Sequence, residues 1–240
     1  MPREGQPLAP LLLVSFSIVN ALAVTSITSE RDGKSLELLM VTDLLPREFL
    51  LGKLFGVLYV TKEMVVLPFL IGVGLWWIGR ISGQDLIFLE VGLVVMYIFT
   101  AMLGIHCGMI YPSSRTAVTL SLGTVFFLFL GVATCILILV SFSGAFEAQL
   151  PSFLSFILGG SVGLYAVLGI RNPSPAILAS ALLLPFATFF AFTSFLIGNQ
   201  NLQVFLVTSG VYGFTALAMM VPALSEYDIA MGRSRQAEDD

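Results

Sequence analysis

The sequence predicts an all-α polytopic transmembrane helix bundle with five to seven membrane helices and an amphipathic helix between the first two spans. Hydrophobic residues make up 57% of the chain and charged residues only 11%, whereas about a quarter of the residues in a soluble domain are charged. The mean hydropathy is +0.97. Because a span needs about 20 apolar residues, the chain has room for at most about eight spans and no large additional domain. We therefore expect one transmembrane domain over residues 1–240, with the lipid bilayer as its main surroundings.

Long apolar runs, separated by charged residues and helix breakers, predict where the helices lie. None of them alternates between polar and apolar positions as a membrane β-barrel strand does, so helices are the spanning structure that fits. The runs on either side of Arg171-Asn-Pro-Ser-Pro175 fit two spans or two re-entrant half-helices equally well. The seven runs lie near residues 8–28, 54–79, 86–110, 118–142, 152–170, 176–198 and 202–224.

Lysine and arginine gather in the connections on one side of the predicted bundle. If the 29–53 connection faces the cytoplasm, successive crossings place 111–117, 171–175 and the 225–240 tail on the same side. Of the 11 lysine and arginine residues, all but Arg3, Lys62 and Arg80 lie in these segments, and positively charged loops stay in the cytoplasm. The C-terminus is therefore expected inside and the N-terminus outside.

The 29–53 connection carries the densest charge in the chain. Leu36, Leu39 and Met40 recur at i, i+3 and i+4, which predicts a short amphipathic helix at the membrane–water boundary. Pro46 favours the first turn of a second helix, which continues into the next span. On physical grounds alone, an ordinary interfacial loop that fixes the topology explains these residues equally well.

The order of residues in this connection is also informative. Glu30-Arg31-Asp32-x-Lys34-Ser35-Leu36-Glu37-Leu38-Leu39 is followed by Val41-Thr42-Asp43-Leu44-x-Pro46-Arg47-Glu48 and by Leu50-Leu51-Gly52-Lys53. This order resembles the signature of ABC-2 type transporter permeases, which marks the cytoplasmic connection that docks on the ATPase. The chain departs from that signature at Asp32, Ser35, Asp43 and Leu45. Family members usually have six spans with the signature after the second, so the resemblance implies a truncated or divergent amino end.

The resemblance implies the membrane subunit of an ABC exporter in a plasma (inner) membrane of bacterial type. Two permease subunits, identical or different, would work with two cytoplasmic ABC ATPase subunits. ATP would bind to the partner chain, so we expect no cofactor, no metal and no catalysis in this one. The residues expected to couple to the ATPase are Glu30, Arg31, Gly33, Leu36, Glu37, Arg47, Glu48, Gly52 and Lys53.

Three charged residues within the predicted spans are candidates for a transport path: Lys62, Glu63 and Glu90. Charges at membrane depth are rare and usually face a polar cavity or a partner. The plainer interpretation places Lys62 and Glu63 near the inner boundary, with the lysine snorkelling to water and the glutamate paired to another helix. It places Glu90 about one turn from interfacial water.

Other functions find little support in the sequence. It contains no GxxxxGK[ST], HExxH or GxSxG motif and no CxxC spacing, so a nucleotide site, an enzyme and a zinc site are not indicated. His106 lies within Gly104-Ile-His-Cys-Gly108, where two glycines four residues apart permit a close contact between helices. The histidine therefore suits helix packing or hydrogen bonding better than metal binding. The net charge of -4 argues against nucleic acid as a partner. The alternatives to an ABC permease are an ATPase-independent channel or carrier and a non-transporting membrane scaffold.

Overall fold

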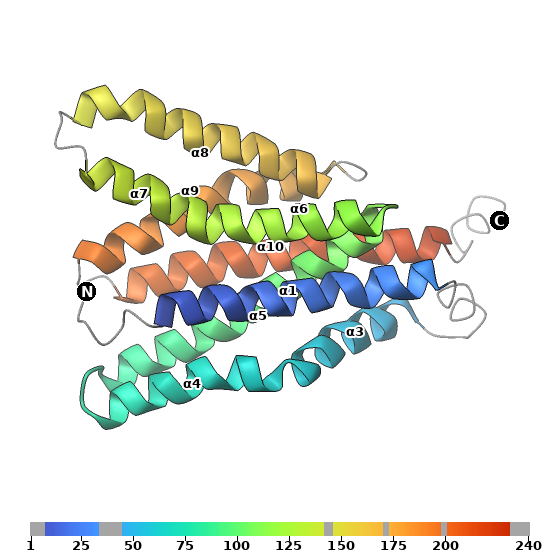
Figure 1. Ribbon diagram of the computed structural model, residues 1–240, viewed down its shortest axis with the longest axis horizontal. Helices are drawn as coiled ribbons and strands as arrows, with labels where there is room; N and C mark the ends of the chain where they lie inside the picture. The colour runs from blue at the N-terminus through green and yellow to red at the C-terminus, as the bar shows by residue number, and fades with distance from the viewer. Residues whose placement is uncertain (1–7, 34–44, 142–145, 170–172, 198–200, 231–240) are drawn as a thin grey trace.

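The protein is a bundle of long helices in the computed structural model, which describes residues 8–33, 45–141, 146–169, 173–197 and 201–230 (Figure 1). Over these ranges the chain is helical and forms no strand, so the predicted all-α class is confirmed. The elements are α1 Leu8–Asp32, α3 Pro46–Val60, α4 Lys62–Trp77, α5 Gly83–Ile110, α6 Ser114–Phe126, the π-helix η2 Phe127–Gly131, α7 Val132–Ser141, α8 Phe146–Gly169, α9 Pro175–Ile197 and α10 Asn201–Ala230.

Five helices in the described ranges are long and apolar enough to cross a membrane: α1, α5, the continuous run from α6 through η2 into α7, α9 and α10. The bent pair α3 and α4 makes a sixth if it is taken as one broken span. Helices α8 and α9 are antiparallel and have 24 and 23 residues. The chain is therefore an integral membrane protein.

The two ends of the bundle differ in charge. Figure 1 shows that α1, α5, α8 and α10 finish at the end where α3, α6 and α9 begin. We call this the charged end, because the described parts of the 29–53 and 111–117 connections lie there. The residues that give it this character are Glu30, Arg31, Asp32, Arg47, Glu48, Lys53 and Arg115.

The centre of the bundle is a close contact between α1 and α5. A Cβ atom on Gly104 would lie 2.6 Å from the Cβ of Ala23 and 2.7 Å from the backbone oxygen of Asn20, and one on Gly108 would lie 2.9 Å from the Cβ of Ile27. The two glycines therefore let the α1 backbone touch α5 directly, as their four-residue spacing predicted.

Hydrogen bonds across the bundle accompany this contact. The Asn20 amide on α1 donates to the Thr100 carbonyl on α5 at 3.0 Å, and its oxygen accepts from the Ser121 hydroxyl on α6 at 2.9 Å. All three residues are buried. Because a polar group in an apolar interior is costly unless it is paired, this chain of bonds fixes the register of three helices.

The predicted span 54–79 is not one straight helix, since α3 and α4 meet at Thr61 with a bend of 66°. The Thr61 hydroxyl donates to the Val57 carbonyl at 2.8 Å, and back-bonding of this kind bends helices. Further along α4, Pro68 has no N–H to give the Met64 carbonyl. That oxygen instead accepts from the Ser15 hydroxyl at 3.0 Å and the Tyr97 hydroxyl at 3.4 Å.

Other boundaries also differ from the predicted ones. Helix α1 continues past residue 28 to Asp32, so Glu30 and Arg31 belong to its last turn instead of to a loop. Gly33 follows that turn, and its N–H donates to the Ser29 carbonyl at 2.9 Å, which closes the end of α1. Helix α10 extends to Ala230, into the predicted tail. The expected amphipathic helix around Leu36 lies outside the described residues.

Replacement of Gly104 by alanine tests the α1–α5 contact. The added methyl group has no space against Ala23 and Asn20, so we expect a loss of about 1–3 kcal/mol in the free energy of unfolding. Gly123→Ala is the matched control, because a Cβ there meets nothing within 4 Å and alanine favours a helix over glycine by about 1 kcal/mol. Unfolding in mixed detergent micelles measures both variants, and an equal loss in the two would contradict the contact.

Candidate functional site

An ion pair joins the two edges of the charged connection. Glu30, in the last turn of α1, pairs through Oε1 with the Lys53 ammonium on α3. The side chains are 29% and 18% exposed, so the pair is partly shielded from water and salt. The ammonium also donates to the Ser26 carbonyl at 3.2 Å and lies 5.7 Å from the centre of the Phe49 ring. The connection therefore begins and ends on helices that are fastened together.

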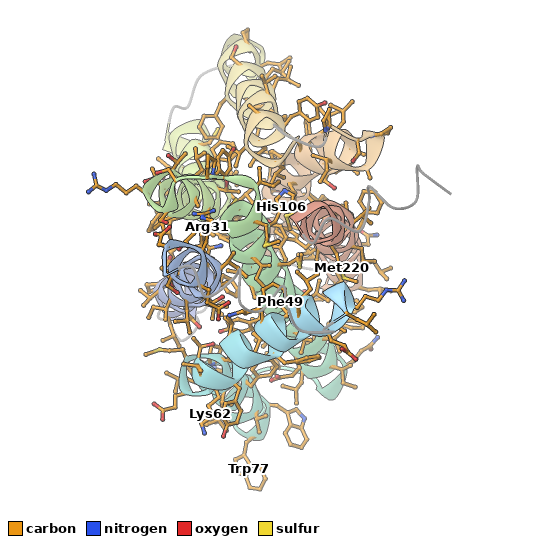
Figure 2. All side chains as sticks on the ribbon, turned by 90° about the vertical axis from the view of Figure 1, so that its right-hand side faces the viewer. Arg31, Phe49, Lys62, Trp77, His106 and Met220 are labelled. Atoms are coloured by element: carbon orange, nitrogen blue, oxygen red, sulfur yellow. The ribbon has the colours of Figure 1, made fainter. Side chains whose placement is uncertain are left out.

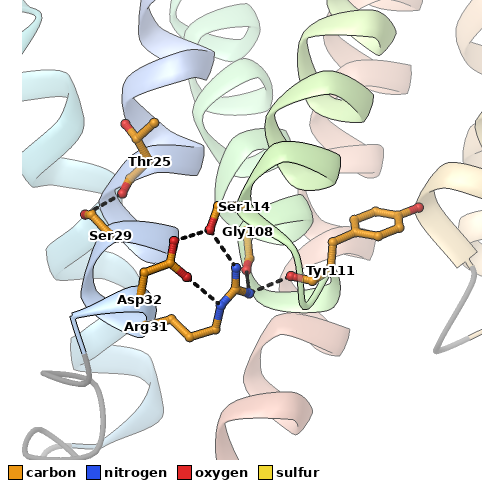
Figure 3. A network of polar contacts seen from close by, with 7 residues as sticks. All are labelled: Thr25, Ser29, Arg31, Asp32, Gly108, Tyr111 and Ser114. Carbon is orange, nitrogen blue, oxygen red and sulfur yellow. Dashed lines mark hydrogen bonds and ion pairs between the residues drawn. The ribbon is translucent and has the colours of Figure 1, made fainter.

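Arg31 fastens the same turn of α1 to α5 and α6 (Figure 3). One guanidinium nitrogen donates to the Gly108 carbonyl at 3.0 Å and to the Tyr111 carbonyl at 2.5 Å, and the other donates to the Ser114 hydroxyl at 3.3 Å. Ser114 in turn donates to the Asp32 carboxylate, which lies 3.8 Å from the Arg31 Nε atom. The cation thus meets carbonyl groups at the negative end of α5 that the helix leaves without partners.

The first turn of α3 follows its predicted start at Pro46. The Leu45 N–H donates to the Glu48 carboxylate at 3.3 Å, which satisfies a backbone donor and places a negative charge at the helix N-terminus. Arg47 and Glu48 are exposed, whereas Phe49 and Leu50 are buried against the bundle. This turn therefore presents charge to water while its next two residues fasten it to the protein.

The structure does not bring the three path candidates together. Lys62 and Glu63 are exposed at the start of α4, and the Lys62 ammonium lies 4.8 Å from the centre of the Tyr59 ring. Figure 2 shows Lys62 at the outer margin of the molecule. Glu90 lies on α5 near the opposite end, where its Oε1 atom is buried 2.6 Å from the position of a Cβ on Gly72. Lys62 and Glu63 thus lie on the surface of the bundle instead of in a common cavity with Glu90.

His106 has the hydrogen-bonding role expected from its sequence context. Its ring is buried, with Nε2 2.9 Å from the Leu168 carbonyl of α8 and Nδ1 3.2 Å from the Met219 carbonyl of α10. The hydroxyl of Tyr111 donates to the neighbouring Val167 carbonyl at 2.9 Å. These two side chains join the charged end of α8 to α5. Figure 2 shows His106 inside the bundle, between the ends of the helices.

Sequence reasoning missed the partners of Arg31. Tyr111 is the first residue of the turn between α5 and α6, and Ser114 is the first residue of α6. The turn is only three residues long and therefore holds α6 beside the end of α5. That short spacing is the signal that could have found them. Glu30 and Arg31, two of the residues expected to couple to the ATPase, are bound to other groups of the chain.

Chemically, this arrangement suits the transmission of force between helices. It links the ends of α1, α3, α5 and α6 through Arg31 and the Glu30–Lys53 pair, with an exposed charged turn beside them. Among the described residues there is no group of three or more histidine, cysteine, aspartate or glutamate side chains that could hold a metal ion. Comparison with protein-family models, curated proteins and solved structures finds no match to the chain.

Exchange of the two charges tests the Glu30–Lys53 pair. We expect Glu30→Lys and Lys53→Glu to lower the free energy of unfolding by about 1–2 kcal/mol each, since each places two like charges together in a partly shielded site. The double variant should recover part of this loss, but not all, because a glutamate at position 53 cannot donate to the Ser26 carbonyl as Lys53 does. A double-mutant cycle of unfolding free energies with no coupling between the two positions would contradict the pair.

Proposed function

We propose that this chain is the membrane subunit of an ATP-driven transporter of the ABC-2 type, and that it exports its substrate with energy from a separate cytoplasmic ATPase. The charged end is then the cytoplasmic side. The observation that carries the proposal is the double attachment of the charged connection. Its first edge is bound to α5 and α6 through Arg31, and its two edges are bound to each other through Glu30 and Lys53.

Such an attachment would let the 29–53 connection act as a lever that passes motion from the ATPase to the membrane helices. A force applied to the connection by a moving ATPase reaches α1 and α3 through their helical ends, and α5 and α6 through the Arg31 hydrogen bonds. Hydrogen bonds to a charged group contribute about 1.5–3 kcal/mol each, and three such contacts resist separation better than one flexible loop would. A loop that only fixes the topology needs positive charge and has no need of these contacts.

The bend at Thr61 gives the lever a place to act. Helix α3 lies beyond the break, and Figure 2, which looks onto the charged end, shows it running sideways past the other helices. A tilt of α3 can therefore change its angle to α4 without moving α4 as a whole. The start of α4 is held separately, because the Met64 carbonyl, which Pro68 leaves without an N–H donor, accepts from Ser15 of α1 and Tyr97 of α5.

A second permease subunit, identical or different, and two ATPase subunits complete the assembly in this proposal. Arg47, Glu48, Glu37 and Leu36 are the contacts proposed for the ATPase, with Gly33 and Gly52 at the edges of the connection. An ATPase-independent carrier would instead bring its membrane charges to a shared site, and Lys62 and Glu63 are exposed on the surface. A scaffold would lack the associated ATPase.

Reversal of charge at Arg47 tests the proposal. We expect Arg47→Glu to abolish association with the ATPase while the chain still folds and inserts, because an acidic residue in the first turn of α3 suits the helix dipole. The tagged chain is purified from membranes of its own host, and ATP hydrolysis by the purified sample is measured together with the presence of a P-loop subunit.

Arg80→Glu, at the opposite end of the bundle, is the control and should retain the ATPase. Glu37→Lys should behave like Arg47→Glu. A wild-type chain that purifies without any P-loop ATPase or ATP hydrolysis would refute the proposal, and so would full activity in the Arg47→Glu sample.

A further inference from the structure

An open groove runs between α1 and α3 at the charged end, with a volume of about 480 Å³. Leu22, Ser26 and Glu30 line its α1 side at intervals of four residues, which is one face of the helix. Leu22 and Glu30 are eight residues apart, so this wall is roughly 12 Å long. It changes along that length from apolar, towards the middle of the bundle, to charged at the end.

The α3 wall changes in the same direction. Val57 and Val60 lie towards the bend, and Phe49, Lys53 and Glu48 lie towards the charged end. Gly52 and Gly56 lie along the same wall and have no side chain to narrow the groove, and a Cβ on either would meet nothing within 4 Å. The groove therefore has a smooth apolar part that opens sideways on the helix surface and a polar part at the membrane–water boundary.

The charges at the polar part are those of Glu30, Glu48 and Lys53, and they sum to one negative charge. Lys53 gives two of its three N–H donors to Glu30 and Ser26; the third has no acceptor among the described residues. Glu48 is exposed, and the oxygen that meets Leu45 is only one of its two. The groove thus offers one donor on a cation and one acceptor on an anion at its polar part.

We infer that this groove binds a phospholipid with a primary-amine headgroup, of the phosphatidylethanolamine class, from the leaflet at the charged end. The phosphate accepts from Lys53, the ammonium donates to Glu48, and an acyl chain lies on Gly52, Gly56 and Val60. Glu30, Glu48 and Lys53 together leave one negative charge, so a headgroup that brings an ammonium along with its phosphate matches the site. An anionic lipid without an amine adds further negative charge to it. This site does not depend on the proposed transport function.

A transmembrane helix of a second copy is the competing occupant, because Gly52 and Gly56 have the four-residue spacing that lets helices approach. The polar part of the groove favours the lipid. A packed apolar helix would cover the charges of Glu48 and Lys53 without supplying partners for them, which is costly. A headgroup instead brings one cation and one anion to the boundary where both charges lie. The same orientation, with polar group outward and chain inward, is imposed on every lipid of the leaflet.

Filling of the groove tests the inference. The purified chain is titrated with defined phosphatidylethanolamine or phosphatidylglycerol in detergent, and native mass spectrometry counts the bound lipids and the subunits. We expect one phosphatidylethanolamine per chain, bound about tenfold more tightly than phosphatidylglycerol, which corresponds to one charge-assisted hydrogen bond. Gly56→Leu should lower this affinity at least about tenfold, and Glu48→Gln should remove the preference between the two lipids.

Gly123→Leu is the matched control, since this exposed glycine of α6 also has nothing within 4 Å of its Cβ position, and it should bind lipid like the wild type. Three results would overturn the inference: equal affinity in the wild type and Gly56→Leu, equal binding of the two lipids by the wild type, or a loss of subunit association in Gly56→Leu with lipid binding unchanged. The last result assigns the groove to a second copy.

Discussion

The rest of the structure depends on the direct contact between the backbones of α1 and α5 at Gly104 and Gly108. Only without side chains at these positions can Ala23 and Ile27 lie so close. The same approach brings the last turn of α1 beside the last turn of α5, where Arg31 reaches the Gly108 carbonyl itself. A small-residue contact in the last two turns of α5 thus determines which carbonyl groups Arg31 meets at the charged end.

A polar network at one end of the bundle follows from that contact. Arg31 ties α1 to α5 and α6, and the Glu30–Lys53 pair ties α1 to α3. Each cation lies where helix ends or carboxylates supply negative charge, so the ends of four helices behave as one unit. The exposed first turn of α3, with Arg47, stands on this unit. Our functional proposal needs an exposed contact on a rigid support, and both occur together at this end.

The sequence was sufficient for the parts of the fold that depend on local composition. Apolar length predicted the five long apolar helices, Pro46 predicted the start of α3, and the spacing of Gly104 and Gly108 predicted a close contact. The bend at Thr61 was not predictable, because it accompanies a bond from a side chain to the backbone within one turn. The partners of the Met64 carbonyl, Ser15 and Tyr97, depend on how α1 and α5 pack against α4. The Glu30–Lys53 pair was missed for a related reason: sequence shows which charges are present, whereas their pairing depends on how far apart two helix ends lie.

The claim that the charged end moves as one unit is tested most directly by distances in the proposed assembly of this chain with an ATPase. Spin labels at Arg47 and Arg115, in a chain whose Cys107 and Cys135 are replaced, report on α3 and α6 at this end, and a label at Trp77 reports on the far end of α4. We predict that trapping the ATPase with ATP and vanadate leaves the distance between positions 47 and 115 unchanged and changes the distance between positions 47 and 77. A change between 47 and 115 with none between 47 and 77 would contradict the account.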